Sequence, residues 1–85
     1  MEKITLKQLT EELNKALKTK PDYIRRGQCI FNYMESTYGV ASEVQFEDKI
    51  DCFYNDSMIL KFVKACLKRI NDKIEAYNAT NKLSK

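Results

Sequence analysis

The stretch ILKFVKACLKRINDKIEAY, residues 59–77, decides the fold class of this 85-residue chain. Its apolar residues recur every three or four positions, which is the period of one face of an α-helix. They are Ile59, Phe62, Val63, Cys66, Leu67, Ile70, Ile74 and Tyr77. The pattern predicts a long helix that begins near Asp56 or Ser57, because both are good N-cap residues, and ends near Asn78.

Two shorter helices are expected upstream. Thr5 and Gln8 have the spacing of a capping box, and a helix over residues 5–19 follows from a stripe of Leu6, Leu9, Leu13, Ala16 and Leu17. A second helix is expected over residues 22–38, capped by Asp22 and stopped by Gly39. Its stripe is Tyr23, Ile24, Gly27, Ile30, Phe31, Met34 and Tyr38.

Gly27 is unusual because a glycine inside a helix costs close to 1 kcal/mol relative to alanine. It lies on the apolar stripe of the second helix, so the close approach of another helix is the favoured explanation. Contact between a ligand and bare backbone is the alternative.

The segment VASEVQFEDKIDCFYN, residues 40–55, has no sustained helical period. We expect a short helical turn over residues 41–44, followed by an ordered loop anchored by aromatic side chains. The alternation of Val44 and Phe46 with polar residues also allows a short β-hairpin that turns at residues 48–49. The predicted fold is therefore mainly α: a compact three-helix domain over residues 1–78 with an acidic, aromatic loop before the third helix, and a frayed polar tail over residues 79–85.

The composition argues against catalysis. Histidine is absent, which removes the usual general base and the commonest metal ligand. The three cysteines are odd in number and match no metal or redox spacing, so they are read as reduced and structural. Glu47, Asp48, Asp51 and Asp56 lack the spacing of a calcium-binding loop. We expect no cofactor and no metal.

The sequence has no leading signal segment and no apolar run of about 20 residues that could cross a membrane. A soluble cytoplasmic protein without membrane contact is expected.

Charge is distributed unevenly along the chain. Residues 1–26 carry a net charge of +3, residues 27–57 carry −5 and residues 58–85 carry +5. Lys61, Lys64 and Lys68 share one face of the third predicted helix, so that face could follow the phosphates of a nucleic acid. A solvated helix face is the favoured interpretation, because no aromatic residue interleaves with these lysines and the isoelectric point of about 8.8 is modest. Nucleic acid is therefore a disfavoured partner.

The candidate binding residues lie on the second predicted helix and in the loop after it. A polar ridge is formed there by Arg25, Gln28 and Asn32. The favoured interpretation is a structural tie to the loop that carries Asp51 and Asp56. The alternative is a site for a partner protein or a small anion. Arg26 extends this candidate site. Phe53 is expected in the core, whereas Tyr33 and Tyr54 are equally consistent with core packing and with contact to a partner.

The segment from residue 25 to residue 70 resembles small proteins encoded by bacteriophages and prophages. Their pattern reads roughly Arg-x-Gly-Gln-x-x-Phe-Asn, then Asp-Cys-Phe-Tyr-x-Asp and a C-terminal helix. The matching positions are Arg25, Gly27, Gln28, Phe31, Asn32, Asp51, Cys52, Phe53, Tyr54 and Asp56. The resemblance implies a phage origin and no catalytic residue. It suggests a protein that binds or inhibits a host protein, either alone or as a homodimer, with sequestration of a small, nucleotide-like signal as the alternative.

Overall fold

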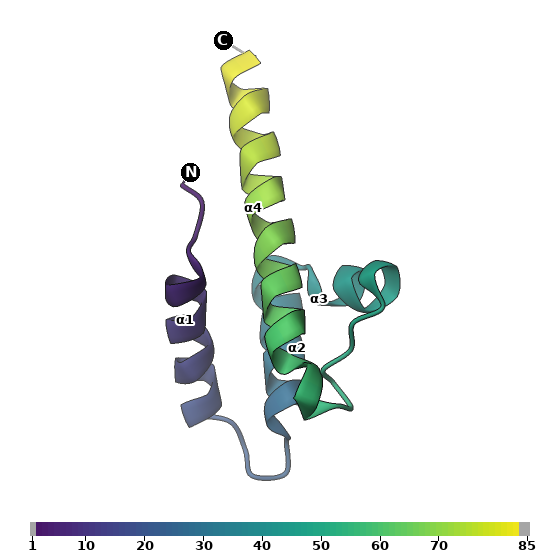
Figure 1. Cartoon of the computed structure of the whole chain (residues 1–85). Coiled ribbons are helices and arrows are strands. Elements are labelled where there is room, and N and C mark those ends of the chain that lie inside the picture. Colours follow the sequence, from purple (N-terminus) through teal and green to yellow (C-terminus); the bar gives the residue numbers. More distant parts are fainter. Residues whose placement is uncertain (1, 84–85) are drawn as a thin grey trace.

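The computed structural model describes residues 2–83, with side chains as far as residue 79 (Figure 1). The described chain is mainly helical and contains no β-strand, so the predicted fold class is confirmed and the hairpin is not found. Its elements are α1 (Leu6–Lys18), α2 (Arg26–Tyr38), α3 (Ala41–Glu43), the π-helical turn η1 (Val44–Asp48), the 3₁₀ turn η2 (Asp56–Met58) and α4 (Ile59–Leu83). The helix count is four rather than three, because α3 stands where only a helical turn was expected.

The helices pack as an α1–α2 hairpin against which the first half of α4 lies (Figure 1). Helices α3 and η1 pack on the side of α4 away from α1, and the C-terminal half of α4 extends beyond the other helices. The molecule is consequently elongated, at 49 × 26 × 19 Å. The segment before α1 is held to α4 by Asn71, whose amide exchanges two hydrogen bonds of 2.9 Å with the backbone of Ile4.

Helix α1 begins as its sequence predicts. The Thr5 hydroxyl accepts a hydrogen bond from the amide of Gln8 (3.1 Å), and the Gln8 side chain accepts one from the amide of Thr5 (2.8 Å). This capping box satisfies two of the backbone donors that a helix start leaves free. Leu9 and Leu13 then turn into the core.

Helix α2 begins four residues later than predicted. The amide of Ile24 donates to the carbonyl of Pro21 (3.1 Å), so residues 21–24 form a turn and Asp22 does not cap the helix. Tyr23 consequently lies outside the apolar stripe and is 85% exposed. Gly39 ends the helix as expected, at a φ of 68° that favours glycine.

The region between α2 and α4 folds as helical turns and then a loop. Val44 is fully buried whereas Phe46, two residues on, is 82% exposed. That difference contradicts the alternation on which the hairpin depended. The loop after η1 is anchored by Phe53, which meets the ring of Phe31 edge-on at 5.4 Å between ring centroids.

The cap of η2 and α4 is Asn55 rather than Asp56 or Ser57. The Asn55 side-chain oxygen accepts from both the amide (3.1 Å) and the hydroxyl (2.6 Å) of Ser57. Helix α4 continues to Leu83 instead of ending near residue 78, because no glycine or proline interrupts the sequence there. Fraying of the tail stays a prediction, and residues 84 and 85 lie outside the described residues.

All four α-helices of the described chain contribute to one hydrophobic core. The buried side chains come from α1, α2, α3, η1, the loop and α4, and they include Leu9, Leu13, Ile30, Met34, Val40, Ala41, Val44, Cys52, Phe62, Val63, Cys66, Ile70 and Ile74. The core therefore fixes where the candidate site residues lie.

Candidate functional site

Arg25 ties the start of α2 to the loop, as the favoured interpretation of the polar ridge predicted. Its Nη2 donates a 2.6 Å hydrogen bond to the carbonyl oxygen of Phe53. Its guanidinium carbon lies 6.0 Å from the centre of the Tyr54 ring, which is exposed. Arg25 and Tyr54 thus come together on the surface, but the guanidinium is already bonded within the chain.

Asp56 and Gly27 form a second tie between the same two segments. The Asp56 Oδ1 accepts a hydrogen bond from the amide of Gly27 (3.1 Å), one of the free donors in the first turn of α2. The thiol of Cys52 donates to the Gly27 carbonyl at 3.3 Å. The close approach that requires glycine is therefore made by the loop and not by another helix. The helix-end amide that a small anion would use is bonded to a carboxylate instead.

The other ridge residues do not join this tie. Asp51 acts within the loop, where its Oδ1 accepts from the amide of Phe53 (2.8 Å) and from the side-chain amide of Gln45 (3.2 Å). Gln28 is partly buried and Asn32 is exposed, and within residues 2–83 neither side chain makes a hydrogen bond.

Tyr33 is a packing residue rather than an exposed anchor. The hydroxyls of Tyr33 and Tyr38 both donate to Oε1 of Glu12, at 2.7 and 2.6 Å, and so join α2 to α1. Burial, followed by the Glu12 hydrogen bond, raises the pKa of both phenols. Sequence reasoning missed Glu12; the available signal was its position beside the apolar stripe of α1.

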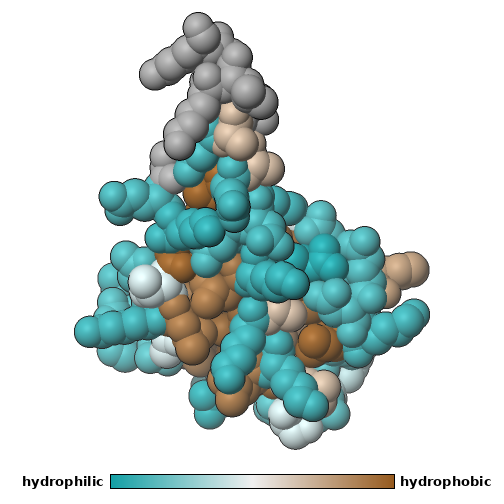
Figure 2. Space-filling view, turned by 45° about the horizontal axis from the view of Figure 1, so that its top comes forward, coloured by the Kyte–Doolittle hydropathy of each residue, from teal (hydrophilic) through white to brown (hydrophobic). Residues whose placement is uncertain are grey.

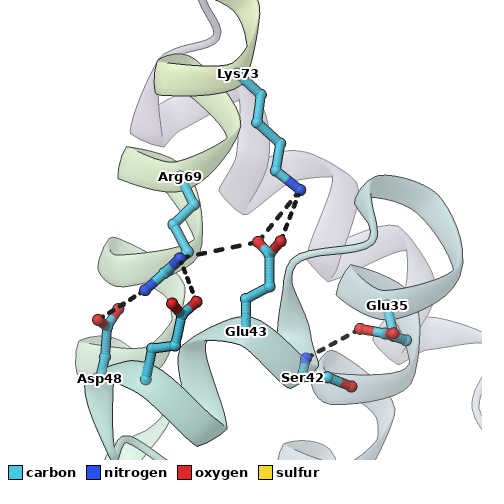
Figure 3. Close-up of polar contacts among 7 residues, drawn as sticks. Glu35, Ser42, Glu43, Asp48, Arg69 and Lys73 are labelled. Carbon is cyan, nitrogen blue, oxygen red and sulfur yellow. Dashed lines mark hydrogen bonds and ion pairs between the residues drawn. The ribbon is translucent and has the colours of Figure 1, made fainter.

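The acidic middle of the chain pairs with α4 (Figure 3). Arg69 donates to both carboxylate oxygens of Asp48, at 2.9 and 3.3 Å, and to Glu47 at 3.1 Å. Lys73 pairs with Glu43 at 3.2 Å. The hydrogen bond from Arg69 lowers the pKa of Asp48. These carboxylates therefore act as structural partners of cations, and no cluster of three or more metal-binding side chains occurs in the part of the chain that the structure describes.

Lys61, Lys64 and Lys68 are all exposed on α4. Lys68 lines a surface cavity together with Asp48, Arg69 and Asp72, and its charge helps to lower the pKa of Asp48. Two carboxylates therefore lie beside the lysine face, which makes it a poorer track for phosphates than three uninterrupted lysines would be.

All three cysteines are free thiols. Cys52 and Cys66 are fully buried, and burial raises the pKa of each to about 12. Both thiols are consequently protonated at neutral pH and are not nucleophiles there.

An apolar trough lies between α1 and the start of α4, with α2 as its floor (Figure 2, where it forms the brown area left of centre). Seven of the ten residues that line its cavity of about 200 Å³ are apolar. They are Leu6, Leu13, Leu17, Ile30, Ile59, Leu60 and Val63. Leu60 is 61% exposed and Leu6 38%, so the two walls of the trough present apolar surface to the solvent. Of the candidate binding residues chosen from the sequence, only Arg26 lines this trough. The sequence did not otherwise predict this surface.

One end of the trough is basic. A shallow cavity of about 410 Å³ continues from it, sharing Asn14, Leu17 and Arg26, and adds Lys18 and Lys20. Among the described residues, the lining of the two cavities includes three cations and no carboxylate. The trough thus combines an apolar floor with a positively charged end.

No family model, curated protein or solved structure matches this chain. None of the described helices combines the length and the low polarity needed to cross a membrane.

Proposed function

We propose that this chain is a non-catalytic binding protein that engages another protein through the α1/α4 trough. The resemblance to small phage proteins makes a host protein the proposed partner and the host cytoplasm the proposed compartment. Inhibition of that host protein is the expected consequence of binding.

The observation that carries the proposal is the exposure of Leu60 beside the buried Ile30 of the floor and the buried Val63 of its own wall. Contiguous apolar surface on a small domain costs free energy in water unless a partner covers it, which is why such patches commonly mark interaction sites. The absence of histidine and the buried state of Cys52 and Cys66 support a binding role over catalysis.

The proposed surface differs from the one that the sequence suggested. Arg25 and Asp56 are bonded within the chain, so their contribution to a partner would require breaking those bonds. Arg26, in contrast, is exposed and its side chain makes no hydrogen bond within residues 2–83, so it belongs to the proposed interface.

Affinity capture from a bacterial lysate at moderate salt tests the proposal. Wild-type protein should retain one host protein reproducibly, and Leu60→Asp should lose it because a carboxylate would be placed in the apolar contact. Tyr23→Asp is the matched control, since Tyr23 is also exposed but lies outside the trough. Equal capture by wild type and Leu60→Asp, or no capture by wild type, contradicts the proposal. Light scattering on the purified chain separates a host partner from a homodimer.

Binding of a small, nucleotide-like anion is the second candidate function. It is favoured by Lys18, Lys20 and Arg26 around one open cavity. A thermal-shift series with nucleotides tests it, because a ligand at one hundred times its Kd adds about 2.7 kcal/mol to the stability of the folded state. No shift with any nucleotide, or a shift that survives Lys20→Ala together with Arg26→Ala, counts against it.

A further inference from the structure

Resting on the proposed function, we infer that the occupant of the trough is one amphipathic α-helix of a partner protein, about three turns long, with carboxylates beside its apolar stripe. The inference follows from three properties of the trough: its walls, its length and its charge.

The walls favour a helix over an extended segment. All of the residues that line the apolar cavity lie in α1, α2 and α4, where most backbone groups away from the helix ends are bonded within their own helices. An extended peptide would therefore meet side chains without backbone partners, and its own amides would be desolvated against leucine and isoleucine. A helix satisfies its backbone internally and presents only side chains, which is the mode of helix-in-groove recognition.

The length of the trough sets the length of the occupant. On α1 its lining runs from Leu6 to Leu17, a rise of about 17 Å at 1.5 Å per residue. A partner helix of about eleven residues covers that distance and supplies anchors at positions i, i+3, i+4 and i+7. These anchors would pack between the leucines of α1 and the apolar residues that begin α4.

The charge selects an acidic occupant. Lys18, Lys20 and Arg26 lie at one end of the trough, and the exposed Lys64 stands one helical turn after Leu60 on the opposite wall. Carboxylates on both edges of a partner helix would meet these cations, whereas lysines there would be repelled.

A second copy of the chain fits this charge poorly. Helices α1 and α4 each carry more basic than acidic residues, and the carboxylates of Glu43, Glu47 and Asp48 are already paired with Arg69 and Lys73. A separate acidic helix therefore complements the trough better than another molecule of the same protein does.

Two fluorescein-labelled peptides of fourteen residues test the inference directly. They share one leucine stripe at helical spacing and differ only at the flanking positions, which are glutamate in one and lysine in the other. By fluorescence anisotropy at low salt, the glutamate peptide should bind wild-type protein at least ~10-fold more tightly than the lysine peptide. Its affinity should fall as salt is added, because the contacts with the basic edge are exposed.

Variants assign the binding to the trough. Leu60→Asp should lose the glutamate peptide, and Lys18→Glu combined with Lys64→Glu should invert the preference between the two peptides. Tyr23→Asp should leave both affinities unchanged. A glutamate peptide with a central proline, which breaks the helix, should bind at least ~10-fold more weakly.

Equal binding of the two peptides overturns the charge selection, and undiminished binding of the proline peptide overturns the helical occupant. A wild-type chain that dimerises through Leu60 overturns the choice of a separate partner. Failure of the glutamate peptide with continued, Leu60-dependent capture of a host protein overturns this inference and leaves the proposed function standing. If neither the glutamate peptide binds nor a host protein is captured through Leu60, the proposed function is overturned as well.

Discussion

The carbonyl oxygen of Cys52 occupies the space that a side chain on Gly27 would need. A Cβ added to Gly27 would overlap that oxygen and lie 2.7 Å from Oδ1 of Asp56. Because the Asp56 carboxylate also accepts from the Gly27 amide, the loop is seated directly on the first turn of α2. One glycine thus allows two side chains of a distant segment, the Cys52 thiol and the Asp56 carboxylate, to bond directly to the backbone of α2.

Gly27→Ala should destabilise the fold by about 2–3 kcal/mol, because either the loop or α2 must move to admit the methyl group. At an uncrowded helix position the same change would stabilise the protein by close to 1 kcal/mol. Urea unfolding followed by circular dichroism measures the difference. Gly39→Ala is the comparison: nothing lies within 4 Å of its added Cβ, so it should cost only the left-handed backbone strain, about 1–2 kcal/mol. A neutral Gly27→Ala would contradict the seating of the loop.

Tyr38→Phe should lower the free energy of unfolding by about 1.5 kcal/mol, the low end for a hydrogen bond to a charged group, because the Glu12 contact is only partly buried. Tyr33→Phe should have a similar effect, and the double variant should lose less than the sum, since both hydroxyls share one oxygen. Tyr23→Phe should be neutral. Strict additivity in this cycle, measured by denaturant unfolding, would argue against the shared acceptor.

The same two tyrosines should make the fold sensitive to alkali. Their pKa values are raised above the usual tyrosine pKa of about 10, so their contribution to stability is fully present below pH 10 and is lost as the pH rises through the raised values. Melting temperatures of wild type should therefore fall between pH 10 and 11.5 more steeply than those of the Tyr33→Phe/Tyr38→Phe variant. Parallel curves would be inconsistent with these shifts.

Arg69→Met should lower the free energy of unfolding, because it removes a partly exposed ion-pair network, and the loss should shrink at 1 M salt. Because Arg69 lowers the pKa of Asp48, the stability contributed by the Arg69–Asp48 pair is present above the unfolded-state pKa of Asp48, near 4. It is lost as the pH falls through the lowered pKa of the folded state. Wild type and variant should consequently converge in stability as the pH falls well below 4. Lys61→Met is the control, because Lys61 is exposed on the same helix, and an equal loss there would point to general charge rather than to the Asp48 contact.

A thiol reagent should label one cysteine rapidly in the native protein and all three in urea. Cys29 is partly exposed, whereas Cys52 and Cys66 are buried with pKa values of about 12, so both lack the reactive thiolate. Absorbance after addition of an aromatic disulfide counts the reacting groups, and mass spectrometry identifies them. Fast labelling of Cys52 would indicate that the loop opens readily from α2.

Much of the helical structure was predictable because its signals are local. The capping box at Thr5, the left-handed stop at Gly39 and the core-facing stripe of α4 as far as Ile74 lie where the sequence placed them. Tyr77 was predicted to continue that stripe but is 53% exposed, because α4 there extends beyond the other helices. The predicted start of α2 was wrong, because an amide of its first turn bonds to Asp56, from a distant segment, and not to Asp22.

By itself, then, the sequence determined the helical class, the stripes that build the core and the lack of histidine chemistry, because these depend on spacing and composition. Tertiary structure alone decided that Arg25 and Asp56 hold a loop, that Glu12 receives two tyrosines, and that Leu6 and Leu60 line one trough. Each of these relationships joins residues more than 20 positions apart, and their meeting depends on how whole helices pack. Side-chain periodicity within a single helix carries no information about that packing.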